Sequence, residues 1–262
     1  MKVILSRKGF DSSNGGCPSP IFPDGTLLSL PIPSDDKLTY ADITAYQGLS
    51  YEQILKQLNP KGNFHGCHLD PDLRSEIRLS IPANWQPAFG QAGSAQGLLR
   101  NNGVGEDDLF LFFGWFKQVQ QIDGVLSYVP NSPNLHVLWG YLQVERVLKN
   151  PDEIEKFDWH PHADSNKYIN QNNALYTARK TLSFDSSKPG SSVLNYSENR
   201  VLTLENGPMA TWRKIPALMP DNIVPDRSNN ASGQGIYYQG IWQELVLKEN
   251  QTSSNWAMSV LQ

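Results

Sequence analysis

Two long apolar segments near the middle of the chain constrain the fold more than any other feature of the sequence. Residues 109–118 read LFLFFGWFKQ, and residues 135–148 read LHVLWGYLQVERVL. The first run is too aromatic and too continuous for an exposed edge strand, so we expect it in the centre of a sheet. Strands this close in sequence usually pair antiparallel. Gly114 within the run indicates a bulge or the close approach of another backbone.

We therefore predict an α+β fold that is rich in β-structure, with a central antiparallel or barrel-like sheet and long loops. Ser50 is placed to begin a helix over residues 50–58, because Gln53 three residues later completes a capping box. The sequence has no internal repeat and no linker of distinct composition, which predicts a single domain over residues 1–262 with elaborated loops. The other expected elements are a strand at 2–5, a short helix at 94–102, strands at 175–182 and 201–204, a loop at 207–234, a strand or helix at 236–248, and a fraying end at 250–262.

The charge balance limits the kind of partner that the chain can bind. The sequence has 22 basic and 26 acidic residues, with a net charge of -4, which argues against a large basic surface that wraps duplex DNA. A pocket for one nucleotide needs only a few local cations. The opening segment MKVILSRKGF has too few apolar residues for a signal peptide, and no apolar run approaches the roughly 20 residues that span a bilayer. Two cysteines without a secretion signal predict a reduced, cytoplasmic protein with no membrane partner.

The first group of polar candidates follows the expected strand at 2–5. Loops at strand ends are where rigid scaffolds present chemistry. An arginine offers a bidentate fork for phosphate, a lysine offers a point charge, and the glycine pair that follows lets backbone N–H groups approach an anion. The spacing is not that of a Walker loop, and an ordinary polar turn also accounts for the segment. The candidates here are Arg7, Lys8, Asp11 and Ser12.

Four of the five histidines lie in two short segments, FHGCHLDPDLR at 64–74 and WHPHADSNKYIN at 159–170. In an extended H-x-H segment, the imidazoles of His160 and His162 project to the same side, which suits a metal ion or a pair of proton-transfer groups. Asp164 can bind a metal, orient an imidazole or act as a base. The same segment is also explained by a His-Pro-His turn on the surface that has no function. The sequence leaves open whether His65 and His68 meet the second segment, and whether a metal or cofactor is bound.

A third group of candidates provides amides, aromatic rings and cations. Asparagine amides bind base edges, and aromatic rings stack on bases. Tyr176 and Trp212 are the aromatic residues of this group, and a position in the hydrophobic core explains each of them at least as well as a binding role. The substrate-binding candidates are Asn173, Tyr176, Arg179, Trp212 and Arg213.

Seven segments in order along the chain carry a family resemblance. They are SRKGFDSSNGG, PSPIFPDGTLLSLPIP, EDDLFLFFGWF, HVLWGYLQVERV, WHPHAD, NALYTA and TWRKIP. Together they resemble the nucleotide modification associated domain 3 proteins. The resemblance implies an association with systems that modify bases in DNA, commonly of phage or bacterial origin. The positions that match are Arg7, Lys8, Asp11, His160, His162, Asp164, Asn173 and Tyr176.

A shorter similarity concerns the architecture. The step from residues 105–109 into a strand, followed by the strand GYLQVERV, looks like the small barrels of PUA-like domains. Such domains often bind modified bases in an aromatic-lined pocket, so the similarity implies the same kind of ligand here.

These observations predict a protein directed at a nucleotide or a nucleic-acid base, acting in DNA base modification as a transferase or hydrolase. Arg7 and Lys8 are expected to hold a phosphate. Asp11 and Asp164 are expected to orient or abstract protons, and His160 and His162 to act as acid and base or as metal ligands. One alternative is a binding module that captures a modified base. Another is a metal-dependent nuclease, and a third is a structural protein whose polar motifs are scattered turns. The oligomeric state stays open.

Overall fold

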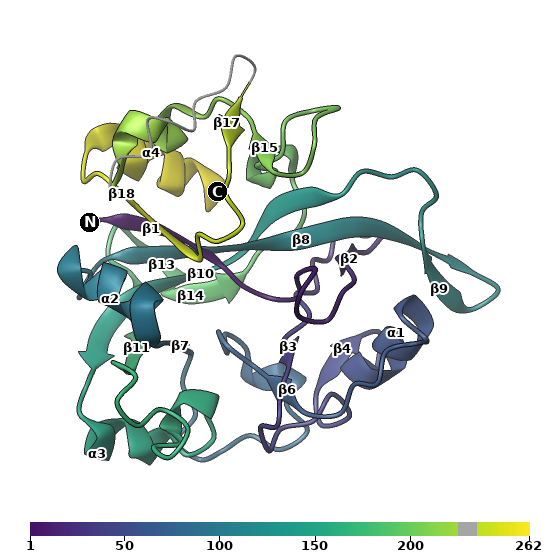
Figure 1. Cartoon of the computed structure of the whole chain (residues 1–262), viewed down its shortest axis with the longest axis horizontal. Helices are drawn as coiled ribbons and strands as arrows, with labels where there is room; N and C mark the ends of the chain where they lie inside the picture. Colours follow the sequence, from purple (N-terminus) through teal and green to yellow (C-terminus); the bar gives the residue numbers. More distant parts are fainter. Residues whose placement is uncertain (225–234) are drawn as a thin grey trace.

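The computed structural model describes residues 1–224 and 235–262, and its centre is a mixed sheet of ten strands (Figure 1). The strand order is β16 (Ile223–Val224), β18 (Glu244–Leu247), β1 (Val3–Arg7), β8 (Leu109–Ile122), β10 (Leu135–Leu148), β11 (Ala174–Ala178) and β7 (Ala88–Gln91). Two further strands, β2 (Ser19–Ile21) and β9 (Val125–Tyr128), pair with β8, and β14 (Ser191–Val193) pairs with β10. Part of the expected loop, residues 225–234, lies outside the described residues.

The two apolar segments pair antiparallel as β8 and β10, which confirms their expected relation. The sheet as a whole differs from the prediction, because β1 and β2 run parallel to β8. It is an open mixed sheet with β16 and β7 at its ends rather than a closed barrel, so the expectation of an antiparallel or barrel-like sheet was wrong for the sheet as a whole. The α+β class agrees with the structure, whereas the PUA-like similarity and the single-domain organisation stay predictions.

The continuous apolar run of β8 is explained by burial on both faces of the sheet. Leu109, Leu111 and Phe113 pack into one hydrophobic cluster. Phe110 and Phe112 point to the other face and pack into a second cluster. Side chains of a strand alternate between faces, so a strand that is covered on both sides needs apolar residues at every position.

The first of these faces is covered by the C-terminal part of the chain (Figure 1). The expectation that residues 250–262 fray was wrong, because they form helix α4 (Gln251–Val260). Its N-cap Asn250 accepts a hydrogen bond from the backbone N–H of Ser253, and Ala257 and Val260 are fully buried. The segment 236–248 contains strands rather than a helix. These are β17 (Ile236–Tyr237), which pairs with β15 (Thr211–Trp212), and β18.

A third hydrophobic cluster lies on the opposite side of the sheet from α4, around helix α1 (Tyr51–Leu58) (Figure 1). The capping box is confirmed, since Ser50 accepts from the backbone of Gln53 and the Gln53 side chain accepts from the backbone of Ser50. Short strands accompany this helix, namely β3 (Ile32–Pro33), β4 (Thr44–Tyr46), β5 (Leu49–Ser50) and β6 (Cys67–His68).

The remaining elements are short. The expected strand at 175–182 is divided into β11 and β12 (Thr181–Leu182), and residues 201–204 make isolated bridges rather than a strand. The others are α2 (Gly93–Asn101), α3 (Pro151–Ile154), β13 (Asp185–Pro189) and 3₁₀ turns at Ser75–Ile77, Glu155–Phe157, Pro161–Ala163, Glu198–Arg200, Pro216–Leu218 and Pro220–Asn222.

None of the helices within residues 1–224 and 235–262 has the length and apolar character to cross a bilayer. Cys17 and Cys67 are free thiols, and both are buried. The cytoplasmic location stays a prediction.

One histidine belongs to the core rather than to a polar site. The Nδ1 atom of His136 accepts a hydrogen bond of 2.9 Å from Trp212, and its ring packs edge-on against Phe113 and Tyr238. Burial lowers the pKa of His136 from 6.5 to about 3. The folded state therefore holds this imidazole neutral at a pH where the unfolded chain protonates it.

This burial predicts a loss of stability in acid. The contribution of His136 is fully present above pH 6.5 and is lost as the pH falls towards about 3, because only the unfolded chain binds the proton in that window. Urea unfolding should show that, for each unit by which the pH falls within this window, the unfolding free energy of wild type decreases by up to about 1.4 kcal/mol more than that of His136→Gln. The same pH dependence in both proteins would contradict the prediction.

Candidate functional site

A polar cavity of about 370 Å³ lies where the ends of β1, β6 and β7 meet the loops around Asp70 and His162. Its lining comes from segments that are far apart in the sequence. The lining residues are Arg7, Lys8, Gly9, Asp11, Asn14, Ile32, His68, Asp70, Gln91, Ala92, His162, Tyr168 and Gln243.

The buried carboxylate of Asp70 is the centre of this site. Its Oδ1 atom accepts a hydrogen bond of 2.6 Å from the backbone N–H of Gly90 on β7. The Nζ atom of Lys8 lies 3.4 Å from Oδ2. The Nε2 atom of His160 lies 3.4 Å from Oδ1, and that of His162 lies 3.9 Å from Oδ2. One carboxylate thus gathers an ammonium and two imidazoles, and the charge of Lys8 together with the Gly90 hydrogen bond offsets the cost of burying its charge.

The protonation states follow from these neighbours. Burial by itself raises the pKa of Asp70, but the Lys8 ammonium and the two imidazoles outweigh it and hold that pKa well below its usual range. Burial lowers the pKa of His162 to about 3 against the opposing charge of Asp70. The site therefore contains an ionised carboxylate beside a neutral imidazole near neutral pH.

The His-Pro-His segment reaches Asp70 by a turn. The backbone of His160 is extended, but Pro161–Ala163 form a 3₁₀ turn, so the expectation of an extended segment was wrong beyond His160. The Nδ1 atom of His160 accepts a hydrogen bond of 3.2 Å from the backbone N–H of His162. The turn, rather than strand alternation, brings both rings to the carboxylate.

The ring of His162 is held from two sides. Its Nδ1 atom lies 2.7 Å from Oδ1 of Asn173, and the amide nitrogen of Asn173 donates to the His162 carbonyl at 2.8 Å. Tyr168 stacks on the imidazole with a centroid separation of 4.4 Å. Asn173 therefore positions a histidine rather than lining this cavity.

The two histidine segments meet through His68. Its ring lies 5.4 Å from that of His162, and its Nδ1 atom is 2.7 Å from Oδ2 of Asp36. Lys167 donates to the other oxygen of Asp36 at 2.8 Å. One possible ligand atom from each of His68, Asp70 and His162 lies within 4.8 Å of the others, so these three residues are candidates to hold a metal. His65 is exposed and lies outside this group.

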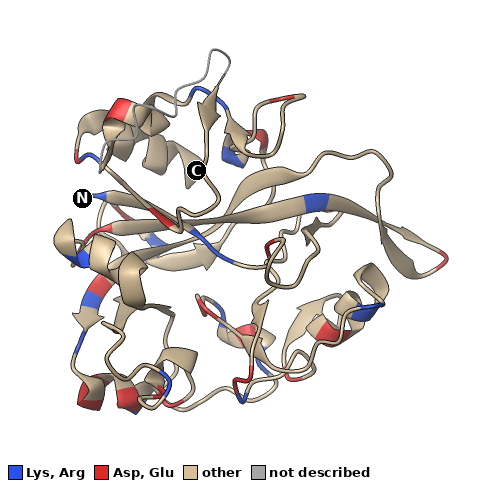
Figure 2. Cartoon of the chain, viewed as in Figure 1, with Lys and Arg blue, Asp and Glu red and all other residues tan. Residues whose placement is uncertain are grey.

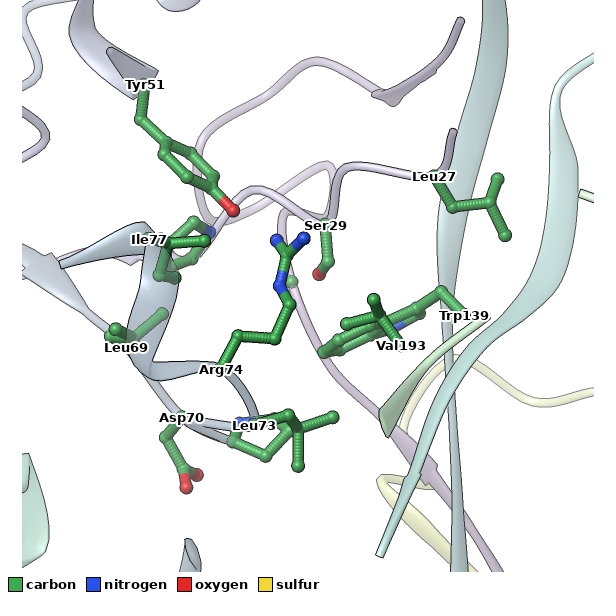
Figure 3. Close-up of a pocket in the computed structure, with 13 residues that line it drawn as sticks. Leu27, Ser29, Tyr51, Leu69, Asp70, Leu73, Arg74, Ile77, Trp139 and Val193 are labelled. Carbon is green, nitrogen blue, oxygen red and sulfur yellow. The ribbon is translucent and has the colours of Figure 1, made fainter. Parts of the chain in front are cut away.

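A smaller cavity behind Asp70 shows which way the carboxylate faces (Figure 3). It has a volume of about 30 Å³, room for about one water molecule. Arg74 extends into it towards Tyr51, while the carboxylate of Asp70 points away from Arg74 (Figure 3). The charge of Asp70 is therefore balanced from the side of Lys8 and the histidines.

The first polar loop contributes to the rim of the large cavity. The guanidinium of Arg7 lies 3.6 Å from Asp11. The Oδ1 atom of Asp11 also accepts from the backbone N–H groups of Ser13 and Asn14, as in an ordinary polar turn. Ser12 is exposed and lies outside the lining residues.

Five other predicted site residues lie away from the cavity lining. Asp164 is exposed, Arg179 pairs with Asp107 at 2.6 Å, and Arg213 donates to the carbonyl of Glu198 at 2.8 Å. The two aromatic candidates are buried core residues, Tyr176 and Trp212.

The predicted set omitted Asp70, Gln91 and Glu244. The Oε1 atom of Glu244 accepts from Ser6 at 2.8 Å and from Gln91 at 2.6 Å, while its Oε2 atom has no hydrogen-bond partner among the described residues. Burial raises the pKa of Glu244 to about 7, opposed by Lys8. A carboxylate within the apolar segment ELVL was the available signal for Glu244.

Fold and site together define an α+β protein with an open mixed sheet and a polar cavity built around a buried carboxylate. The chain belongs to the nucleotide modification associated domain 3 family, whose model matches residues 2–255. This confirms the resemblance carried by the seven segments, and the family name relates the chain to nucleotide modification. A comparison with curated proteins and one with solved structures found no match.

The packing of His162 on β7 gives a test of the site geometry. A Cβ atom at Gly90 would lie 2.3 Å from the His162 ring. We expect Gly90→Ala to displace this ring and to cost about 1–3 kcal/mol of unfolding free energy, because the surrounding core is closely packed. Imidazole NMR signals of His162 should move. Gly97→Ala is the control, because a Cβ atom added at Gly97 would have its nearest contact at 3.8 Å. Equal His162 signals in the two variants would contradict the geometry.

Proposed function

We propose that the large cavity binds a nucleotide, or a single base presented from nucleic acid, and catalyses group transfer or hydrolysis during base modification. The observation that carries this proposal is the buried carboxylate of Asp70, in contact with Lys8 and two imidazoles at the wall of an open cavity. Ionisable groups gathered in this way are typical of catalytic sites. The family name supports a nucleotide as the substrate class.

The cations of the site divide into two roles. Arg7 lies at the end of β1, lines the cavity and is about a quarter exposed, so its planar fork can receive a phosphate. Lys8 is buried against Asp70 and over the ring of Phe89, at 4.4 Å from the ring centroid. Lys8 is therefore a structural cation of the carboxylate in this state, and Arg7 is the proposed phosphate ligand.

The charge distribution supports a small substrate. Figure 2 shows basic and acidic residues interspersed over the elements, without a continuous basic stripe in that view. With the net charge of -4, this favours one nucleotide or one extruded base over a grip on the duplex.

A second cavity provides donors and acceptors next to the first. Its volume, about 450 Å³, exceeds the 370 Å³ of the large cavity at Asp70, and the two cavities share His162 and Tyr168. The amide side chains of residues 170–173 line it. Amides of this kind can bind base edges, so this cavity is the proposed position for a base or a neighbouring nucleotide.

The binding-module alternative predicts an aromatic cage. Among the described residues that line the large cavity, Tyr168 is the one Phe, Tyr or Trp, and it stands beside two histidines, two aspartates and two basic residues. This composition favours chemistry over simple capture.

The proposal is tested by nucleotide binding. We expect native mass spectrometry and calorimetry to detect a nucleotide, and Arg7→Gln to weaken its binding about tenfold, because a charge-assisted phosphate contact contributes about 1.5–3 kcal/mol. Affinity for the matching nucleoside, which lacks the phosphate, should not change. Arg179→Gln is the control, because Arg179 pairs with Asp107 outside the cavity. The proposal fails if no nucleotide or oligonucleotide binds, or if both arginine variants lose affinity equally.

A further inference from the structure

We propose that His68, Asp70 and His162 form a binding site for one divalent transition-metal ion. Each residue offers a nitrogen or oxygen atom within 4.8 Å of the other two. Two imidazoles and one carboxylate are a ligand set that suits ions such as Zn²⁺ or Fe²⁺ and leaves further coordination positions open. This inference deepens the proposed function and rests on it for the identity of the substrate.

Hydrogen bonding fixes which nitrogen of His162 can bind a metal. The amide nitrogen of Asn173 donates to the His162 carbonyl, so the other end of that amide is an oxygen. This oxygen lies 2.7 Å from Nδ1 of His162 and can only accept, which places the imidazole proton on Nδ1. The Nε2 lone pair, 3.9 Å from Asp70, is then free to bind an ion.

The same reasoning applies to His68. Its Nδ1 atom lies 2.7 Å from a carboxylate oxygen of Asp36, which requires a proton on Nδ1, so the neutral ring that binds a metal has its lone pair on Nε2. Asp36 is in turn fixed by Ser34 at 2.8 Å and Lys167 at 2.8 Å. Metal-binding histidines are typically held in this way, with the distal N–H donated to a carboxylate or carbonyl oxygen.

The third ligand also has a fixed orientation. The backbone N–H of Gly90 occupies Oδ1 of Asp70, so Oδ2 is the oxygen that faces His162 and Lys8. The Lys8 ammonium, 3.4 Å away, supplies positive charge to this oxygen. A metal ion would share the carboxylate with Lys8, and the two cations would repel each other.

The position of the triad gives the ion access to a ligand. His68, Asp70 and His162 all line the large cavity, so open coordination positions would face it. The charged lining residues there are Arg7 and Lys8 against Asp11 and Asp70, which balance. A divalent ion would make the cavity positive, which favours a phosphate group.

Cobalt binding tests the triad on the full-length chain. The protein is stripped with a chelator and titrated with Co²⁺, and binding is followed by visible absorption and by metal content after desalting. We expect one ion per chain, and at least tenfold weaker binding in His68→Gln and in His162→Gln. His65→Gln is the matched control, because His65 is exposed and outside the triad. A chain that retains no stoichiometric cobalt, or an equal loss in His65→Gln and His68→Gln, would overturn the proposal.

Lys8→Met gives a second readout that does not depend on losing a ligand. Removing the competing ammonium should tighten Co²⁺ binding at least tenfold, and the ion should raise the thermal midpoint of this variant more than that of wild type. Weaker or unchanged cobalt affinity in a folded Lys8→Met protein would contradict a metal at Asp70.

These measurements are independent of the nucleotide test. Stoichiometric cobalt without nucleotide binding would support the metal site and overturn the proposed function. Nucleotide binding to a chain that retains no cobalt would support the function and overturn the metal site.

Discussion

The buried charge of Asp70 is the interaction on which the arrangement of the site depends. An ionised carboxylate away from water is stable only when charges and hydrogen-bond donors surround it. Here the compensation comes from Lys8, which directly follows β1, from the Gly90 amide on β7 and from the Nε2 side of His160 at the start of the 3₁₀ turn. Three segments that are distant in sequence are thereby held at one point, and loss of any one leaves the buried carboxylate with less compensation.

Local signals in the sequence predicted the elements well, whereas the relations between elements were harder to predict. The Ser50 capping box and the aromatic run of β8 depend on near neighbours and on burial, both of which the sequence displays. Strand direction is different, because the short segment of β1 carries no information about whether it runs parallel to β8. Helix α4 was missed because its stability comes from tertiary burial of Ala257 and Val260 rather than from helix propensity.

The site residues follow the same pattern, since local features could be predicted from the sequence and contacts between distant segments could not. Residue type alone selected Arg7, Lys8 and the His-Pro-His segment as candidates, and the fold brings Arg7, Lys8 and His162 to one cavity and His160 to Asp70. The carboxylate that these groups contact could not be chosen, because proximity in the chain favoured Asp164 and the fold supplied Asp70. The sequence does not indicate which distant loops lie close together in the fold, so the hydrogen bond between His68 and Asp36 could not be predicted either.

The glycine within the aromatic run has a consequence for the motion of the site. A Cβ atom at Gly114 would lie 2.6 Å from the carbonyl oxygen of Lys8, so the bare backbone is what allows β1 to lie this close. The Lys8 amide in turn donates to the carbonyl of Phe113 at 2.8 Å. The lysine beside the carboxylate is thus hydrogen-bonded to the buried part of β8 in the centre of the sheet. Exchange of the Lys8 amide hydrogen with solvent requires this hydrogen bond to β8 to break, so motion of the lysine backbone is coupled to opening of the neighbouring part of the sheet.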